Sequence, residues 1–139
     1  MHPEDSRINH YKEIENLDKK KEYNVDTSSN IDFTVNISYH NPSFINYDII
    51  DKSVRVIDMV SMTIGDKSIN DHIKSFTFHI IDKNTIFIVL DVKEQYRGIF
   101  FGRKMANIFA IKRLLSNISA TASKKTGDSI AITMHHITD

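Results

Sequence analysis

Two segments of the chain alternate between apolar and polar residues, as a β-strand does when one of its faces is buried. Ile31–Tyr39 (IDFTVNISY) and Ser75–Ile81 (SFTFHII) both follow this period of two. Thr85–Val92 (TIFIVLDV) is apolar almost throughout, and only Asp82–Asn84 separates it from the strand before it. The pattern predicts two half-buried strands and one apolar strand, with the last two strands joined as a hairpin.

Two further segments are predicted to be strands. Ser53–Ile64 (SVRVIDMVSMTI) is rich in β-branched residues, which favour strands, and Asp128–Ile137 has apolar residues at alternate positions. The short apolar stretch Phe44–Ile50 follows neither period, so the pattern leaves its state open.

From Gly102 onward the spacing of the apolar residues changes to three and four. This spacing places them on one face of a helix, and it predicts one continuous helix over residues 103–122, followed by a glycine stop at Gly127. Phe109 belongs to this face, and we expect it to be a large core side chain. The predicted buried residues are Met105, Ile108, Phe109, Ile111, Leu115, Ile118 and Ala122.

Taken together, these segments predict an α+β fold with the element order β-β-β-β-α-β. We expect a mixed, mostly antiparallel five-stranded sheet with one long helix packed on it. Residues 31–139 would form this single domain, whereas residues 1–30 are polar and weakly patterned. The pattern favours a solvated N-terminal extension, with a short helix over residues 7–21, rather than a docking arm.

The composition excludes several classes of function. The chain has 18 basic and 18 acidic residues among 139, which argues against attachment to nucleic acid or a membrane by bulk charge. It has no cysteine, so disulfides, thiolate metal sites and cysteine nucleophiles are excluded. The sequence shows no signal-peptide pattern and no apolar run of membrane-spanning length. We therefore expect a cytoplasmic protein, and the abundant Ile, Asn and Lys suggest a bacterial or viral source.

The segment Val92–Met105 (VKEQYRGIFFGRKM) carries the clearest candidate chemistry. It contains Gly98 and Gly102, two of the four glycines, with Arg97 and Arg103 beside them. A predicted strand precedes it and the predicted helix follows it. Free backbone N–H groups at a helix N-terminus can hold an anion, so a strand, a Gly/Arg turn and a helix in succession are typical of an anion site.

This segment resembles the acyl-coenzyme A site of the GCN5-related N-acetyltransferase family. The resemblance implies that the turn holds the pyrophosphate of acetyl-CoA through Arg97, Gly98, Phe101, Gly102 and Arg103. It also implies that the backbone of Leu90 and Val92 pairs with the pantetheine arm. The positions that match the family pattern without a gap are Val92, Tyr96, Arg97, Gly98, Gly102 and Arg103.

The sequence departs from the family pattern in two places. Phe100 stands where the family has its middle glycine, and Asp139 comes before the family's later helix and last strands. The resemblance therefore implies a truncated or degenerate acyl-CoA-binding protein, whose substrate half is absent, is supplied by a partner, or never existed. Asp91, next to the turn, is the candidate catalytic base.

Two other classes of function remain open. The lack of a convincing acid/base pair favours a non-catalytic protein–protein interaction module, such as a small adaptor, regulator or inhibitor. A single-stranded nucleic-acid binder is disfavoured, because with zero net charge the basic cluster is better explained as the solvated face of the helix. This cluster comprises Arg97, Arg103, Lys104, Lys112, Arg113, Lys124 and Lys125.

Metal binding is not expected. His135 and His136 are adjacent on a predicted strand, so their side chains point to opposite faces and cannot easily bind one ion together with Asp139. Asp58 is expected on the solvated face of its predicted strand.

A sheet with one helix has too little cover for both faces and edges. Phe44–Tyr47 or the terminal strand Ile130–Ile137 would then be exposed. We therefore expect a homodimer or a complex with a protein partner, formed by strand addition or face packing.

Overall fold

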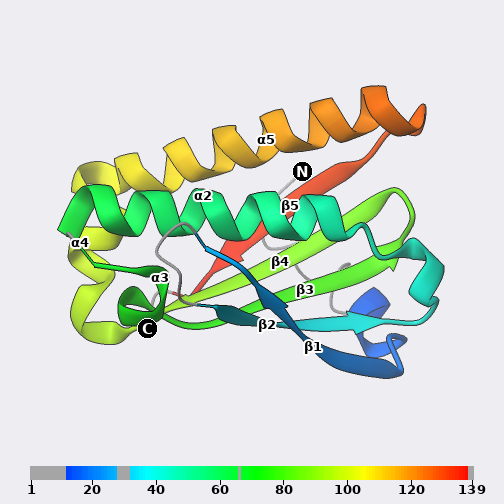
Figure 1. Cartoon of the computed structure of the whole chain (residues 1–139), viewed down its shortest axis with the longest axis horizontal. Helices are drawn as coiled ribbons and strands as arrows, with labels where there is room; N and C mark the ends of the chain where they lie inside the picture. Colours follow the sequence, from blue (N-terminus) through cyan, green and yellow to red (C-terminus); the bar gives the residue numbers. More distant parts are fainter. Residues whose placement is uncertain (1–11, 28–31, 66, 138–139) are drawn as a thin grey trace.

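The computed structural model describes residues 12–27, 32–65 and 67–137. These residues form one five-stranded sheet with helices packed against it (Figure 1). The strands are β1 (Lys19–Val25), β2 (Phe33–Tyr39), β3 (Ile73–Asp82), β4 (Thr85–Val92) and β5 (Ala131–His136). The long helices are α2 (Tyr47–Gly65) and α5 (Ala106–Thr126), and α3 (Ile69–His72) and α4 (Arg97–Phe101) are short. Three 3-10 turns complete the described chain, η1 (Pro42–Phe44), η2 (Glu94–Tyr96) and η3 (Arg103–Met105).

The strands lie in the sheet in the same order as in the sequence, β1-β2-β3-β4-β5. β1–β2 and β3–β4 are antiparallel pairs, whereas β2–β3 and β4–β5 are parallel pairs. Each parallel pair is joined by a crossover that contains a long helix, α2 in the first case and α5 in the second. The predicted five-stranded mixed sheet is confirmed, but half of its strand pairs are parallel. The predicted order β-β-β-β-α-β is matched only in part.

The prediction of a strand at Ser53–Ile64 is wrong, because these residues lie in helix α2. The β-branched residues suggested a strand, yet the burial follows a spacing of three and four, which is that of a helix face. The buried residues are Ile49, Ile50, Ser53, Val54, Ile57, Asp58 and Ser61. Burial of this stripe against the sheet outweighs the small helix-propensity cost of Val and Ile. The fold thus has two long helices, and they pack against each other on one face of the sheet (Figure 1).

The fifth strand comes instead from the polar N-terminal segment. β1 has the sequence KKKEYNV and pairs antiparallel with β2 over its whole length. The predicted helix over residues 7–21 is therefore wrong at its end, where residues 19–21 belong to the strand. Residues 12–15 are helical, and residues 7–11 lie outside the described part of the chain.

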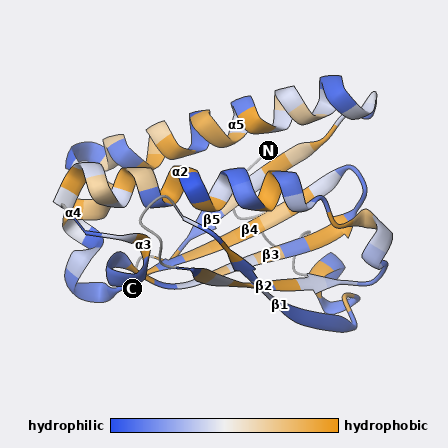
Figure 2. Ribbon diagram, viewed as in Figure 1, coloured by the Kyte–Doolittle hydropathy of each residue, from blue (hydrophilic) through white to orange (hydrophobic). Residues whose placement is uncertain are grey.

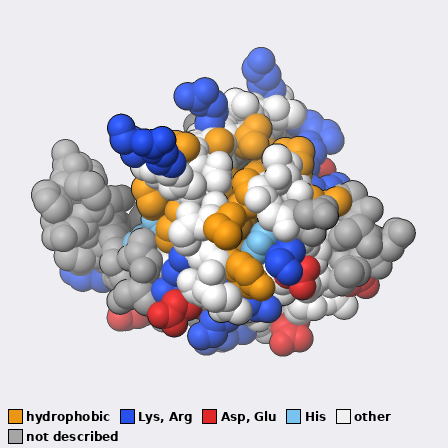
Figure 3. All heavy atoms as spheres, turned by 90° about the vertical axis from the view of Figure 1, so that its left-hand side faces the viewer, with side chains coloured by type: hydrophobic (Ala, Val, Ile, Leu, Met, Phe, Trp, Pro, Cys, Tyr) orange, Lys and Arg blue, Asp and Glu red, His pale blue; other side chains and the backbone are white. Residues whose placement is uncertain are grey.

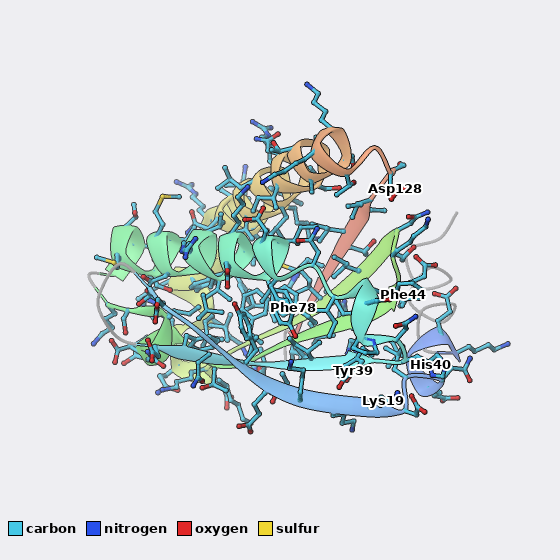
Figure 4. The ribbon with its side chains drawn as sticks, turned by 45° about the vertical axis from the view of Figure 1, so that its right-hand side comes forward. Lys19, Tyr39, His40, Phe44, Phe78 and Asp128 are labelled. Atoms are coloured by element: carbon cyan, nitrogen blue, oxygen red, sulfur yellow. The ribbon has the colours of Figure 1, made fainter. Side chains whose placement is uncertain are left out.

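The core lies between the sheet and the helix pair. Figure 2 shows β4 coloured as hydrophobic over most of its length, whereas β1 is hydrophilic. Phe78 points from β3 into the layer beneath α2, and Phe76 stacks on it with 4.7 Å between ring centroids (Figure 4). The prediction that Phe44–Tyr47 or Ile130–Ile137 is an exposed apolar patch is wrong for Ile45, Ile130 and Met134, which are buried. Tyr47 packs against Tyr23 of β1, with 4.8 Å between the rings.

Helix α5 confirms the predicted periodicity but not its limits. It begins at Ala106 rather than at residue 103 and continues to Thr126, with Gly127 as its C-cap. Its buried residues are Ile108, Ile111, Leu115 and Ala122. Phe109, which was predicted to be buried, is 63% exposed. Ile108 lies on the buried face of α5 together with Ile111, Leu115 and Ala122, whereas Phe109 is turned by about 100° from Ile108 and points away from the core.

Candidate functional site

The segment between β4 and α5 was predicted to be one tight anion-binding turn. It is instead a succession of three short helical segments, η2, α4 and η3. Phe100 and Phe101 of α4 are buried, and the Phe101 ring lies edge-on to His136 of β5 at 5.1 Å. These two aromatic residues anchor the segment to the end of the core, which explains why α4 forms between the strand and the long helix.

The Arg97 side chain folds back onto β4. Its Nε donates to the Val92 carbonyl at 3.0 Å, and its Nη2 donates to Oδ1 of Asp91 at 3.3 Å. Both side chains of this ion pair are largely buried, at 15% and 13% exposure. The structure therefore brings together the predicted anion ligand Arg97 and the predicted base Asp91, and each neutralises the other. A charge-assisted pair of this kind holds α4 against the strand.

Gly102 has a structural role that requires glycine. Its φ is +79°, and a Cβ there would lie 2.7 Å from Nδ2 of Asn107. The Asn107 amide in turn donates to the Ile99 carbonyl at 3.2 Å and ties α5 to α4. Lys104 and Met105 also have positive φ, at 55° and 63°. These left-handed residues break the backbone between Gly102 and Ala106, which is why the long helix begins later than predicted.

The other predicted cofactor residues are distributed around this break. Leu90 and Val92 are fully buried in β4, and the Leu90 carbonyl accepts from the Ile137 N–H at 3.0 Å. Gly98 is exposed in α4, and its carbonyl accepts from Gly102. Arg103 is exposed beside the start of α5. Binding of acyl-CoA by these residues stays a prediction, and the hydrogen bond to Leu90 is one with which a pantetheine arm would have to compete.

Two buried polar side chains, Asp58 and His72, lie near the segment between β4 and α5. Asp58 of α2 is 1% exposed, and its Oδ1 accepts from the Ile69 N–H at 2.9 Å. The expectation that Asp58 lies on a solvated strand face is therefore wrong, because it lies on the inner side of a helix and caps α3. His72 of α3 is also 1% exposed and contacts the rings of Tyr96 and Phe100 edge-on. Burial lowers the pKa of the His72 imidazole below its ordinary value.

The outer edge of β5 is the second candidate site. Among the residues that the structure describes, no segment pairs with this edge. Ala131 donates its N–H to the Asn84 carbonyl, and Ile137 donates to Leu90, so the odd-numbered residues face β4. Because N–H groups along a strand alternate between its two sides, Ile132, Met134 and His136 direct theirs outward. This edge is therefore able to pair with another extended chain.

A groove runs beside this edge, between β5 and α5. It has a volume of about 270 Å³ and is lined by Lys112, Leu115, Ser116, Ile132, Thr133 and Met134. Phe109 is three residues before Lys112 and seven before Ser116, so it lies on the same helix face and flanks the groove. The sequence named the terminal strand Ile130–Ile137 as one candidate surface for strand addition, but it assigned Phe109 to the core, whereas Phe109 is exposed. The usable signal was the terminal strand AITMHH, which carries no Lys, Arg, Asp, Glu or Pro.

The two edges of the sheet differ in their protection. β1 carries Lys19, Lys20, Lys21 and Glu22, and charged side chains on an edge strand disfavour pairing with another chain. β5 carries no such charges, and its backbone edge lies beside an apolar groove. The two edges therefore differ in the charged side chains that oppose pairing, which β1 carries and β5 lacks.

Exposed apolar side chains concentrate toward the α4 end of the molecule. Figure 3 views this end directly and shows hydrophobic side chains distributed across it. The four large apolar residues that are clearly exposed in the described chain are Met59, Met62, Ile99 and Phe109. They come from the second half of α2, from α4 and from the first turn of α5 (Figure 1).

A polar depression lies on the face of the sheet opposite α2 and α5. Its volume is about 600 Å³, and its lining residues are Lys20, Lys21, Glu22, Asn36, Ile37, Ser38, Thr77 and His79. Burial, with a smaller effect of Lys20, lowers the pKa of His79. The depression is open to solvent, and its lining combines both signs of charge with hydroxyl and amide groups. It therefore selects no single ligand chemistry.

The described residues contain no group of three or more His, Asp or Glu side chains placed to hold a metal ion. His135 and His136 have ring centroids 6.2 Å apart, and Asp139 lies outside the described chain. No helix in the described part is both long enough and apolar enough to cross a membrane.

The chain has no counterpart in the comparisons with known proteins. No family model matches it, and neither a curated protein nor a solved structure matches it.

Proposed function

We propose that this chain is a non-catalytic protein–protein interaction module that binds an extended segment of a partner along the outer edge of β5. The observation that carries the proposal is the pairing of β5, which leaves the N–H groups of Ile132, Met134 and His136 directed away from β4. An added strand gains main-chain hydrogen bonds at such an edge, and neighbouring pockets select its side chains.

The groove between β5 and α5 supplies the second requirement of strand addition. The incoming strand would lie beside β5, and every second side chain of it would point to the helix-covered face of the sheet. These side chains would lie next to the groove lined by Leu115, Ile132 and Met134. Phe109, which flanks the groove, adds an exposed aromatic surface of the kind enriched in protein interfaces. Lys112 at the same groove favours an acidic or carbonyl-bearing neighbour in the partner strand.

The test is a selection of binding peptides from a random library displayed on phage. We expect the selected peptides to be extended, to alternate apolar residues and to lose binding to an Ile132→Lys variant, which places a charge at the groove. The matched control is Asn24→Lys, which adds the same charge to the exposed face of β1 and should leave binding unchanged. Peptides that bind both variants equally well would show that the partner does not use β5.

A second candidate, acyl-CoA binding, is favoured by Arg103 and Lys104, which are both exposed immediately before α5. Its test is the melting temperature in millimolar coenzyme A, because a ligand present at a hundred times its Kd stabilises a protein by about 2.7 kcal/mol. Arg103→Ala should abolish the shift, whereas Lys124→Ala at the far end of α5 should preserve it. No shift of the unmodified chain would remove this candidate.

A further inference from the structure

Among the described residues the outer edge of β5 is unpaired, and an antiparallel copy of the same strand is an occupant that this edge can accept. Its outward N–H groups belong to Ile132, Met134 and His136, which are evenly spaced about Met134. An antiparallel copy of the same strand would place Met134 opposite Met134 of the partner subunit. Ile132 would then lie opposite His136 of the partner subunit, and the reverse pair would be identical.

We propose that the chain forms a two-fold homodimer through antiparallel pairing of β5 with β5 of a second copy, centred on Met134. This proposal rests on the proposed function and names the partner strand. The pairing joins two five-stranded sheets into one continuous sheet, with the α5 helices of both copies on the same face. It places outward-facing residues of one strand opposite outward-facing residues of the other, so that their N–H and carbonyl groups satisfy each other.

Charge and closure favour this arrangement over pairing with the opposite edge. β5 contains no Asp, Glu, Lys or Arg, so no side chains of these types meet as like charges across the seam. Pairing of β5 with β1 of another copy would bring up Lys19, Lys20 and Lys21, and it would leave the uncharged edge of one β5 still unpaired. Such a head-to-tail contact does not close, whereas the β5–β5 contact uses the free edge of both copies and stops there.

In this dimer the groove beside β5 would become part of an apolar strip that crosses the two-fold axis. Ile132 and Met134 lie on the helix-facing side of the strand and line the groove together with Leu115. Across the two-fold axis the same residues of the partner subunit extend this apolar strip. Phe109 lies on the groove side of α5, toward its N-terminus, and antiparallel pairing brings that part of the helix toward the beginning of the partner's β5. The net charge of zero adds no long-range repulsion between the copies.

The register is tested by single-cysteine variants, because the natural chain contains no cysteine. In a hydrogen-bonded antiparallel pair the opposite Cα atoms are about 5.5 Å apart. A disulfide spans Cα separations of about 4.4–6.8 Å. Met134→Cys should therefore form a cross-linked dimer under mild oxidation with copper–phenanthroline. Thr133→Cys is the matched control, since Thr133 lies opposite His135 of the partner subunit and about 7–8 Å from its own copy.

The mass of the unmodified chain, measured by analytical ultracentrifugation at micromolar concentration, is the second measurement. We expect a dimer that Ile132→Lys converts to a folded monomer and that Asn24→Lys leaves intact, with circular dichroism as the check on folding. A monomer throughout the micromolar range would overturn the homodimer and leave the peptide-binding proposal standing on its own selection experiment. Faster cross-linking of Thr133→Cys than of Met134→Cys would overturn the register.

Discussion

Truncation of Phe100 and of Phe109 to alanine tests the placement of α4 and the orientation of α5. Both are phenylalanines within ten residues of each other, yet Phe100 is 0% exposed and Phe109 is 63% exposed. Phe100 lies in α4, with its ring 5.9 Å from His72, so truncation to alanine leaves a cavity inside the core. Removal of a fully buried phenylalanine costs about 3–5 kcal/mol, as the sum of the lost transfer free energy and the cavity.

The same substitution at Phe109 should cost much less. A phenylalanine loses about 1.5–3 kcal/mol of transfer free energy when it is fully exposed, and only the covered third of Phe109 contributes. Alanine also has the higher helix propensity, which returns about 0.5 kcal/mol in α5. We therefore expect Phe109→Ala to change the free energy of unfolding by less than about 1 kcal/mol.

Urea unfolding followed by circular dichroism measures both values. Both variants are best made in the Ile132→Lys background, so that the proposed dimer does not contribute to unfolding. The slope of the free energy against urea concentration should stay constant, because the surface exposed on unfolding is nearly the same. Equal losses in the two variants, or a larger loss for Phe109→Ala, would refute the placement of α4 and the orientation of α5.

Three further predictions concern the same end of the molecule. Because burial lowers the pKa of His72, its neutral form favours folding, so its contribution to stability should be complete above the ordinary pKa of about 6.5 and should fall as the pH drops below that value. A His72→Gln variant should show a smaller loss on acidification in urea unfolding. Gly102→Ala should lower the melting temperature and reduce the free energy of unfolding by about 1–2 kcal/mol. Gly98→Ala, where a Cβ meets open space, should be neutral or stabilising. Similar losses at both positions would contradict the backbone described. Asp58→Ala should cost about 1–3 kcal/mol in denaturant unfolding because it leaves the first N–H of α3 buried without its acceptor, and Asp58→Asn, which keeps an acceptor oxygen, should lose less.

The sequence predicted those strands whose side chains alternate across a half-buried sheet. Phe33–Tyr39, β3, β4 and β5 were all found from period two or from a short apolar run, and the hairpin between β3 and β4 is confirmed. α2 was missed because valines and isoleucines were weighed by intrinsic preference, whereas their spacing buries one helical face. β1 was missed because an edge strand with polar side chains on both faces has no hydrophobic period to detect.

The candidate site was predictable in composition but not in geometry. Gly98, Gly102 and the flanking arginines do lie between a strand and a long helix, as expected. The sequence could not show that Arg97 turns back to Asp91, because a side-chain direction depends on the tertiary position of α4. Nor could it show that β5 lies at an edge, since edge positions follow from the order of all the strands. The exposure of Phe109 had the same cause, because it depends on which face of α5 packs against the sheet.

The agreement between strand order and chain order also governs how this protein folds during its synthesis. Each strand pairs only with its immediate neighbours in the sequence, so each new strand finds its pairing edge already made on the ribosome. β4 carries the greatest risk of aggregation during synthesis. It is the most apolar strand, and its partner β5 follows only after the whole of α5. Until residues 131–136 leave the ribosome, the edge of β4 stays open to other nascent chains. A pause in translation after α5 should therefore promote aggregation more than a pause after α2.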